Sequence, residues 1–165
     1  MANRSYLYAV DRIPDGTAPV RAVGVSEWPW DLPTVHLVLV SGHPRVCPST
    51  IWDPPVTAIV AERTASRANL ERYLAALPVS LETADAADEA RGFLDRLDVA
   101  LPYLLLEHAE IDDLDEAVPL PDAAAGWLAA AGDADALVRS AGRVRPDGLA
   151  AATGRGSWST QLYFG

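Results

Sequence analysis

The sequence contains no lysine, because all thirteen of its basic residues are arginine. Chemistry that depends on a lysine amine, such as Schiff-base formation or phosphate binding by a P-loop, is therefore excluded. Cysteine is nearly as scarce, since Cys47 is the only one. A single cysteine forms neither a disulfide within the chain nor a multi-cysteine zinc site, and this usage is typical of a reducing compartment. We therefore expect a cytoplasmic protein.

Long hydrophobic runs are missing as well. The most apolar segments, residues 35–40 and 102–106, are far shorter than the about 20 residues that a membrane-spanning helix needs. Residues 6–10 are likewise too few for the apolar part of a signal peptide. The net charge of −10 disfavours nucleic acids and anionic membranes as partners, since both attract basic surfaces. We expect neither kind of partner.

The sequence does contain enough apolar residues for one core. With 165 residues, of which 50% are hydrophobic, the chain has the size of a single domain that spans residues 1–165. Apolar residues that recur three and four positions apart predict amphipathic helices. They fall in four segments, over residues 66–77, 83–98, 122–131 and 134–141.

Strand patterns occur at both ends of the chain. Residues 5–10 are apolar on both alternating faces, as in a strand covered on two sides, whereas residues 158–164 alternate as a half-buried strand does. Residues 35–40 fit a buried strand or a short helix, and residues 103–106 fit a short strand or a helical turn. Residues 56–60 are a further strand candidate. Prolines in the first third of the chain leave room there for short elements only.

These patterns together predict the fold class α+β. We expect a single domain with a small sheet that includes the N- and C-terminal strands, packed by the four helices. The first and last strands are expected to pair in this sheet.

The acidity is concentrated in one segment. Residues 82–122 hold thirteen of the 23 carboxylates against two arginines, a charge of −11, whereas the other ten carboxylates and eleven arginines sum to +1. Such a segment is either a solvated surface or a face that docks a basic partner. The leading hypothesis is a non-catalytic interaction protein, immunity-like or regulatory, that binds a basic protein partner. Its candidate partner-binding residues are Glu107, Glu110, Asp112, Asp113, Asp115 and Glu116.

A small enzyme is the alternative that the residues leave open. His43 lies four residues before Cys47 and is the type of neighbour that activates a thiolate. The carboxylates of residues 112–116 are also ligands that a divalent cation prefers, although the EF-hand spacing is absent. Zinc-ligand spacings and the recognised catalytic motifs are missing from the sequence. We therefore assign no catalytic residue, no metal ligand and no cofactor.

The tryptophans of the proline-rich first third offer a third possibility. Trp28, Trp30 and Trp52 would either fill the core of a region with few long elements or form an aromatic ligand pocket.

Several short segments resemble a known group of proteins. They are Met1-Ala2-Asn3-Arg4-Ser5-Tyr6-Leu7-Tyr8, Ser41-Gly42 with Pro44-Arg45-Val46-Cys47, Ile51-Trp52-Asp53 and Leu162-Tyr163-Phe164. In these segments the chain is similar to a bacterial family of uncharacterised proteins, a domain of unknown function, whose members begin with the same eight residues. The resemblance implies a small bacterial cytoplasmic protein and supports the two terminal strands. It assigns no activity and no site residue.

Overall fold

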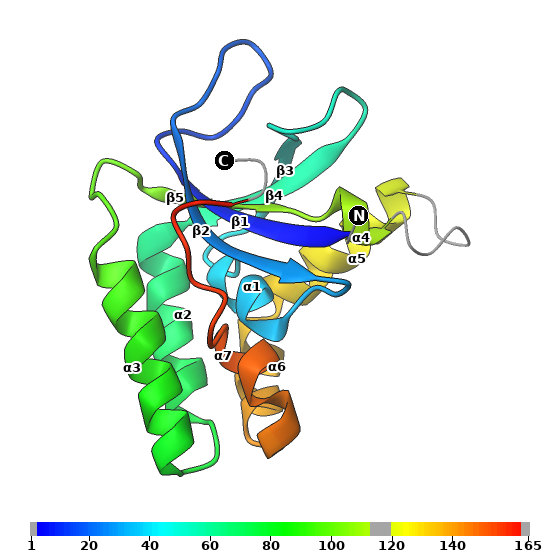
Figure 1. The fold of residues 1–165 in the computed structure, drawn as a ribbon. Helices are drawn as coiled ribbons and strands as arrows, with labels where there is room; N and C mark the ends of the chain where they lie inside the picture. Colours follow the sequence, from blue (N-terminus) through cyan, green and yellow to red (C-terminus); the bar gives the residue numbers. More distant parts are fainter. Residues whose placement is uncertain (1–2, 113–119, 163–165) are drawn as a thin grey trace.

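One antiparallel sheet forms the centre of the computed structural model, which describes residues 3–112 and 120–162 (Figure 1). In these residues the sheet has five strands in the order β2-β1-β5-β4-β3. The strands are β1 (Arg4–Val10), β2 (Ala22–Pro29), β3 (Arg45–Pro48), β4 (Thr57–Glu62) and β5 (Tyr103–Glu107). The predicted α+β class is confirmed, with the N-terminal strand β1 inside the sheet between β2 and β5.

Helices cover one face of this sheet, and two of them form a hairpin that extends beyond it (Figure 1). The helices are α1 (Thr34–Leu39), α2 (Arg63–Ala75), α3 (Leu81–Asp95), α4 (Ala109–Asp112), α5 (Leu120–Gly132), α6 (Ala134–Ala141) and α7 (Leu149–Thr153), with a 3-10 turn, η1 (Pro146–Gly148). Among the described residues, none of these helices has the length and apolar character needed to cross a membrane.

Both faces of β1 are buried, which explains its apolar sequence. Leu7 and Ala9 face the helices and join the main core. Tyr6, Tyr8 and Val10 face the other side, where a second cluster is completed by residues of the loops 11–21 and 49–56 and by the C-terminal segment. We call this second side the loop-covered face.

The helix α1 is attached to the sheet by a buried histidine. The ring of His36 lies between two strands, with Nδ1 3.2 Å from Ser5 Oγ of β1 and Nε2 2.8 Å from Ser26 Oγ of β2. Burial lowers the pKa of His36 to about 3, so the ring is neutral and bridges two hydroxyl groups. Residues 35–40, which fitted a strand or a helix, thus lie mainly in a short helix that begins after Pro33.

The C-terminal strand predicted over residues 158–164 is wrong in its described part, which ends at residue 162. Trp158 forms a single bridge with Ser26, so β2 rather than β1 is its neighbour. The segment then crosses closely over Gly24, where an added Cβ would lie 2.7 Å from Leu162 Cγ. Because the chain turns onto the loop-covered face, it cannot continue along the edge of the sheet.

The remaining predictions agree with the structure except in the first third of the chain. The four predicted helices are confirmed as α2, α3, α5 and α6, and α3 begins earlier than expected because Ser80 caps it, with Ser80 Oγ accepting from the backbone N–H of Thr83 at 3.0 Å. The candidates over residues 56–60 and 103–106 are the strands β4 and β5. The eight-residue strand β2 was not expected among the prolines; Pro29 is its last residue.

Candidate functional site

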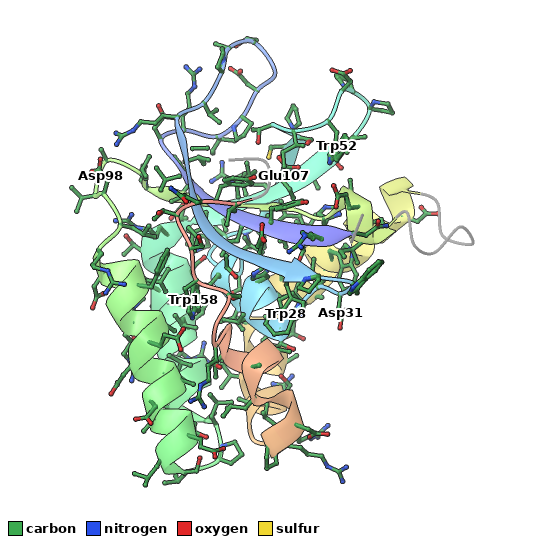
Figure 2. All side chains as sticks on the ribbon, in the orientation of Figure 1. Trp28, Asp31, Trp52, Asp98, Glu107 and Trp158 are labelled. Atoms are coloured by element: carbon green, nitrogen blue, oxygen red, sulfur yellow. The ribbon has the colours of Figure 1, made fainter. Side chains whose placement is uncertain are left out.

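The predicted partner-binding carboxylates begin with Glu107, which lies inside the protein. Strand alternation turns Glu107 toward the loop-covered face, where its side chain is only 1% exposed (Figure 2). Its carboxylate accepts hydrogen bonds from Ser49 Oγ at 2.7 Å and from Thr50 N and Oγ1 at 2.7 and 2.9 Å. Buried charges need such partners. Glu107 therefore fastens the loop 49–56 to the sheet and is not exposed for docking.

Asp112 is also buried, in a network that ties three elements together. Its Oδ2 lies 2.6 Å from His108 Nδ1, and its Oδ1 accepts a hydrogen bond from Trp127 Nε1 at 2.7 Å. The carboxylate thus links the end of β5 to α4 and α5. The aspartate–histidine pair is the arrangement that orients an imidazole for acid–base work. Because His108 is 1% exposed, however, no substrate reaches its ring, and we interpret the network as structural.

Sequence reasoning missed this network because it treated the carboxylates as charges rather than as hydrogen-bond acceptors. The signal available in the sequence was the spacing of four residues between His108 and Asp112, which matches one helical turn. Trp127 carried no such signal, since it is fifteen residues away from Asp112 and joins the network only through the packing of α5.

Glu110 connects α4 to the start of β1. Its Oε2 accepts hydrogen bonds from the backbone N–H of Arg4 at 2.9 Å and from Tyr6 Oη at 3.3 Å. Burial, together with the nearby Glu110 carboxylate, raises the pKa of Tyr6. Glu110 is thus partly engaged within the protein. The other predicted residues, Asp113, Asp115 and Glu116, lie outside the described residues, and their docking role stays a prediction.

The alternative catalytic pair is not brought together. Cys47 is buried in β3, and its thiol lies 3.8 Å from the carbonyl oxygen of Ala58 on the neighbouring strand. Burial, helped by the Glu107 charge, raises the pKa of Cys47 to about 12, so the thiolate is disfavoured at neutral pH. The exposed His43 instead places Nδ1 3.2 Å from Glu62 Oε2. Within residues 3–112 and 120–162, no group of three histidine, cysteine or carboxylate side chains is arranged to hold a metal ion.

The tryptophans of the first third do not share one pocket. Trp28 faces the helix side of β2, on the same side as Ser26 two residues earlier, whereas Trp52 lies on the loop 49–56 over the opposite face (Figure 2). Trp30 follows β2 with a positive φ of 66° and is largely exposed. Each of the three rings therefore lies in a different environment, and they do not form the shared aromatic pocket that the sequence left open.

A different part of the acidic segment is exposed, at the end of the α2–α3 hairpin. We call Val79, Leu81, Glu82 and Asp85 the hairpin tip. Val79 is fully exposed, and Leu81, the first residue of α3, is 85% exposed. The two carboxylates are exposed as well, and neither makes a hydrogen bond or ion pair with any described residue. The tip thus combines apolar side chains with unpaired negative charge.

The rest of the outer face of α3 is acidic too, but its carboxylates are engaged. Asp88 pairs with Arg91 at 3.2 Å, and Glu89 accepts a hydrogen bond from the backbone N–H of Gly156 at 3.1 Å. On the inner face, alanines and Leu94 pack against the core. Carboxylates in the first turn of a helix interact favourably with the helix dipole, which accounts for Glu82 at the start of α3. The exposure of Val79 and Leu81 has no comparable explanation within the helix.

The fold and these sites define a small α+β protein whose buried polar groups mainly hold the loops and short helices on the sheet. A family model for a domain of unknown function, DUF7822, matches residues 11–143. The chain therefore belongs to the DUF7822 family, in agreement with the sequence resemblance to a domain of unknown function. No curated protein and no solved structure matches the chain.

Proposed function

We propose that this protein is a non-catalytic interaction protein that docks a basic partner protein through its acidic segment, with the hairpin tip as the contact surface. The observation that carries the proposal is the exposure of Val79 and Leu81 directly beside the unpaired carboxylates of Glu82 and Asp85. The role is regulatory or immunity-like, in the cytoplasm of a bacterium, as composition and resemblance lead us to expect. Asp113, Asp115 and Glu116 remain candidates for further contacts.

The apolar part of the tip would supply the affinity. Burying a valine or leucine side chain contributes about 1.5–3 kcal/mol. The two residues together thus offer about 3–6 kcal/mol before the costs of association. Contiguous exposed apolar surface marks sites that another molecule covers, and Val79 and Leu81 lie two residues apart in the exposed turn before α3 and at its first residue.

The charged part of the tip would select the partner. Two unpaired carboxylates next to an apolar contact favour a partner that places arginine or lysine side chains around an apolar anchor. A cavity of about 150 Å³ beside the tip offers room for such an anchor. Its lining contains Glu82 of the tip and the basic Arg145 together with Pro78, Ser80, Thr83, Val144, Pro146 and Leu149. Steering by exposed charges weakens as the salt concentration rises.

Site-specific photo-crosslinking in the source organism tests this proposal. A photoreactive amino acid is placed at position 79, with position 99 as the control, because Val99 is equally solvated, at 86%, but follows the opposite end of α3. We expect one discrete adduct at position 79, with a basic protein as identified by mass spectrometry. We expect none at position 99.

The charge requirement is tested with a double variant, Glu82→Gln with Asp85→Asn, which keeps the shape of the tip. The adduct at position 79 should weaken in this variant. It should also weaken when the protein with only the photoreactive residue at position 79 is crosslinked in lysate at high salt. Identical adducts at positions 79 and 99, the absence of an adduct, or an adduct that survives both treatments unchanged would each show that the tip is only a solvated surface.

A further inference from the structure

A cavity lies on the loop-covered face, far from the hairpin tip. The loops 11–21 and 49–56 both extend beyond the sheet on this side (Figure 1). Between them is a cavity of about 330 Å³. Apolar side chains form one part of its wall and the polar residues Ser49 and Thr50 another, with Tyr8 of β1 also in the lining. The apolar part consists of Pro14, Ala18, Pro19, Val20 and Ile51.

Tyr8 lines this cavity and carries a hydroxyl group that is unsatisfied inside the protein. The residue is 4% exposed, and its Oη atom is buried without a hydrogen-bond partner. Ser49 and Thr50 also line the cavity, and both donate their hydroxyl protons to Glu107. Leaving a buried hydroxyl unpaired costs stability. Buried polar groups in folded proteins therefore usually have a hydrogen-bond partner, from the protein, water or a ligand.

The surrounding charges determine what kind of partner fits. Burial raises the pKa of Tyr8, and the carboxylates of Glu107, Glu27 and Glu110 raise it further. The phenol therefore keeps its proton at neutral pH and acts as a hydrogen-bond donor. The same three carboxylates produce a negative potential at the hydroxyl, which opposes an anionic ligand.

We propose that this cavity binds a small uncharged organic molecule with an apolar body and a carbonyl oxygen that accepts a hydrogen bond from Tyr8 Oη. Proline, alanine, valine and isoleucine side chains would surround the apolar body. The cavity volume falls at the lower end of the range of about 300–1,000 Å³ found for small-molecule sites, which limits the ligand to a compact molecule. The inference does not depend on the docking role of the hairpin tip.

Benzamide and benzoate provide a matched pair of probes, because both carry a carbonyl oxygen on the same ring and only benzoate is charged. Binding is followed by amide chemical shifts of the 15N-labelled protein during titration. We expect benzamide to shift the amides of residues 15–18, 20–22 and 49–51 in a saturable manner. Benzoate should bind at least about tenfold more weakly, because it enters the negative potential of the three carboxylates.

The variant Tyr8→Phe tests the hydrogen bond, and Tyr73→Phe is its control. Tyr73 is equally buried in the helix-side core and also has an unpartnered hydroxyl. Removing either hydroxyl should leave the free energy of unfolding unchanged or raised, since no hydrogen bond is lost. Only Tyr8→Phe should weaken benzamide binding, by roughly 2- to 13-fold, the loss expected for one hydrogen bond.

Three results would overturn the proposal. They are the absence of cavity shifts up to the solubility limit of benzamide, equal affinities for benzamide and benzoate, and an unchanged affinity in Tyr8→Phe. A crystal structure grown with benzamide gives an independent readout. An ordered water on Tyr8 Oη with no benzamide beside it would show that water alone completes the hydroxyl.

Discussion

Replacing Glu107 by glutamine should destabilise the protein far more than its removal of one charge suggests. The three donors that meet this carboxylate have few alternatives. Ser49 Oγ donates its only proton to Glu107 and accepts from the backbone N–H groups of Ile51 and Trp52 at 3.1 and 3.0 Å. In either orientation the new amide would direct an NH₂ group at Ser49 or at the N–H of Thr50, so two donors would face each other.

The magnitude follows from these contacts. A hydrogen bond to a charged group contributes about 1.5–3 kcal/mol, and a buried donor left without a partner costs about 1–3 kcal/mol. The loop 49–56 can move to relieve part of this conflict, so we expect Glu107→Gln to lower the free energy of unfolding by about 2–4 kcal/mol. For a protein of this size that corresponds to a fall in Tm of about 4–16 °C.

Urea unfolding of the variant measures this effect, with Glu62→Gln as the matched control. Glu62 ends the adjacent strand β4, but its side chain is 44% exposed and, among the described residues, forms ion pairs with His43 and Arg45 only, so its substitution should cost at most about 1 kcal/mol. Faster hydrogen exchange of the Thr50 amide in Glu107→Gln would locate the damage at the loop. If the two variants lose equal stability, the assignment of Glu107 as a buried fastener is refuted.

Three further predictions test other parts of the interior. Cys47 should react with a thiol reagent only slowly in the native protein at neutral pH and rapidly in denaturant, because its pKa is raised to about 12. Gly24→Val should displace the C-terminal segment, because the new Cβ would meet the Thr160 carbonyl oxygen at 2.9 Å; faster amide exchange in that segment checks this. His36 has a folded pKa of about 3, below its unfolded value of about 6.5, so its contribution is present above about pH 6.5 and is lost as the pH falls toward 3. His36→Gln should therefore flatten the pH dependence of unfolding.

Much of the architecture could be predicted from the sequence wherever a regular pattern was long enough. Residues 5–10 were recognised as a central strand because both faces are apolar, and α3 was recognised from its alanine and leucine spacing. The strand β2 was not predicted, because the register between β1 and β2 shifts between Leu7 and Tyr8. This shift interrupts the alternation of inward and outward side chains along β2. The C-terminal segment alternates like a strand, yet the close approach at Gly24 depends on a residue far away in the chain.

The candidate sites were harder to predict, since the sequence does not distinguish a buried carboxylate from an exposed one. Glu107 and Asp112 lie in the densest acidic run, but their roles depend on hydroxyls of residues 49–50 and on Trp127, which the fold brings to them. The unpaired carboxylates at the hairpin tip were counted within the acidic segment without being singled out. The Tyr8 cavity had no sequence signal, because it depends on the positions of two loops.

The acidic segment has two separate physical consequences in the folded protein. Glu82 and Asp85 direct their charge outward from the hairpin tip, which favours a basic macromolecule. Glu107 and Glu110 produce a negative potential inside the protein at Tyr8, which favours an uncharged small molecule over an anion. Figure 1 shows the hairpin and the two loops extending from opposite ends of the molecule. Occupancy of the cavity should therefore leave crosslinking at position 79 unchanged, because neither ligand reaches the other's residues and the five-stranded sheet lies between them.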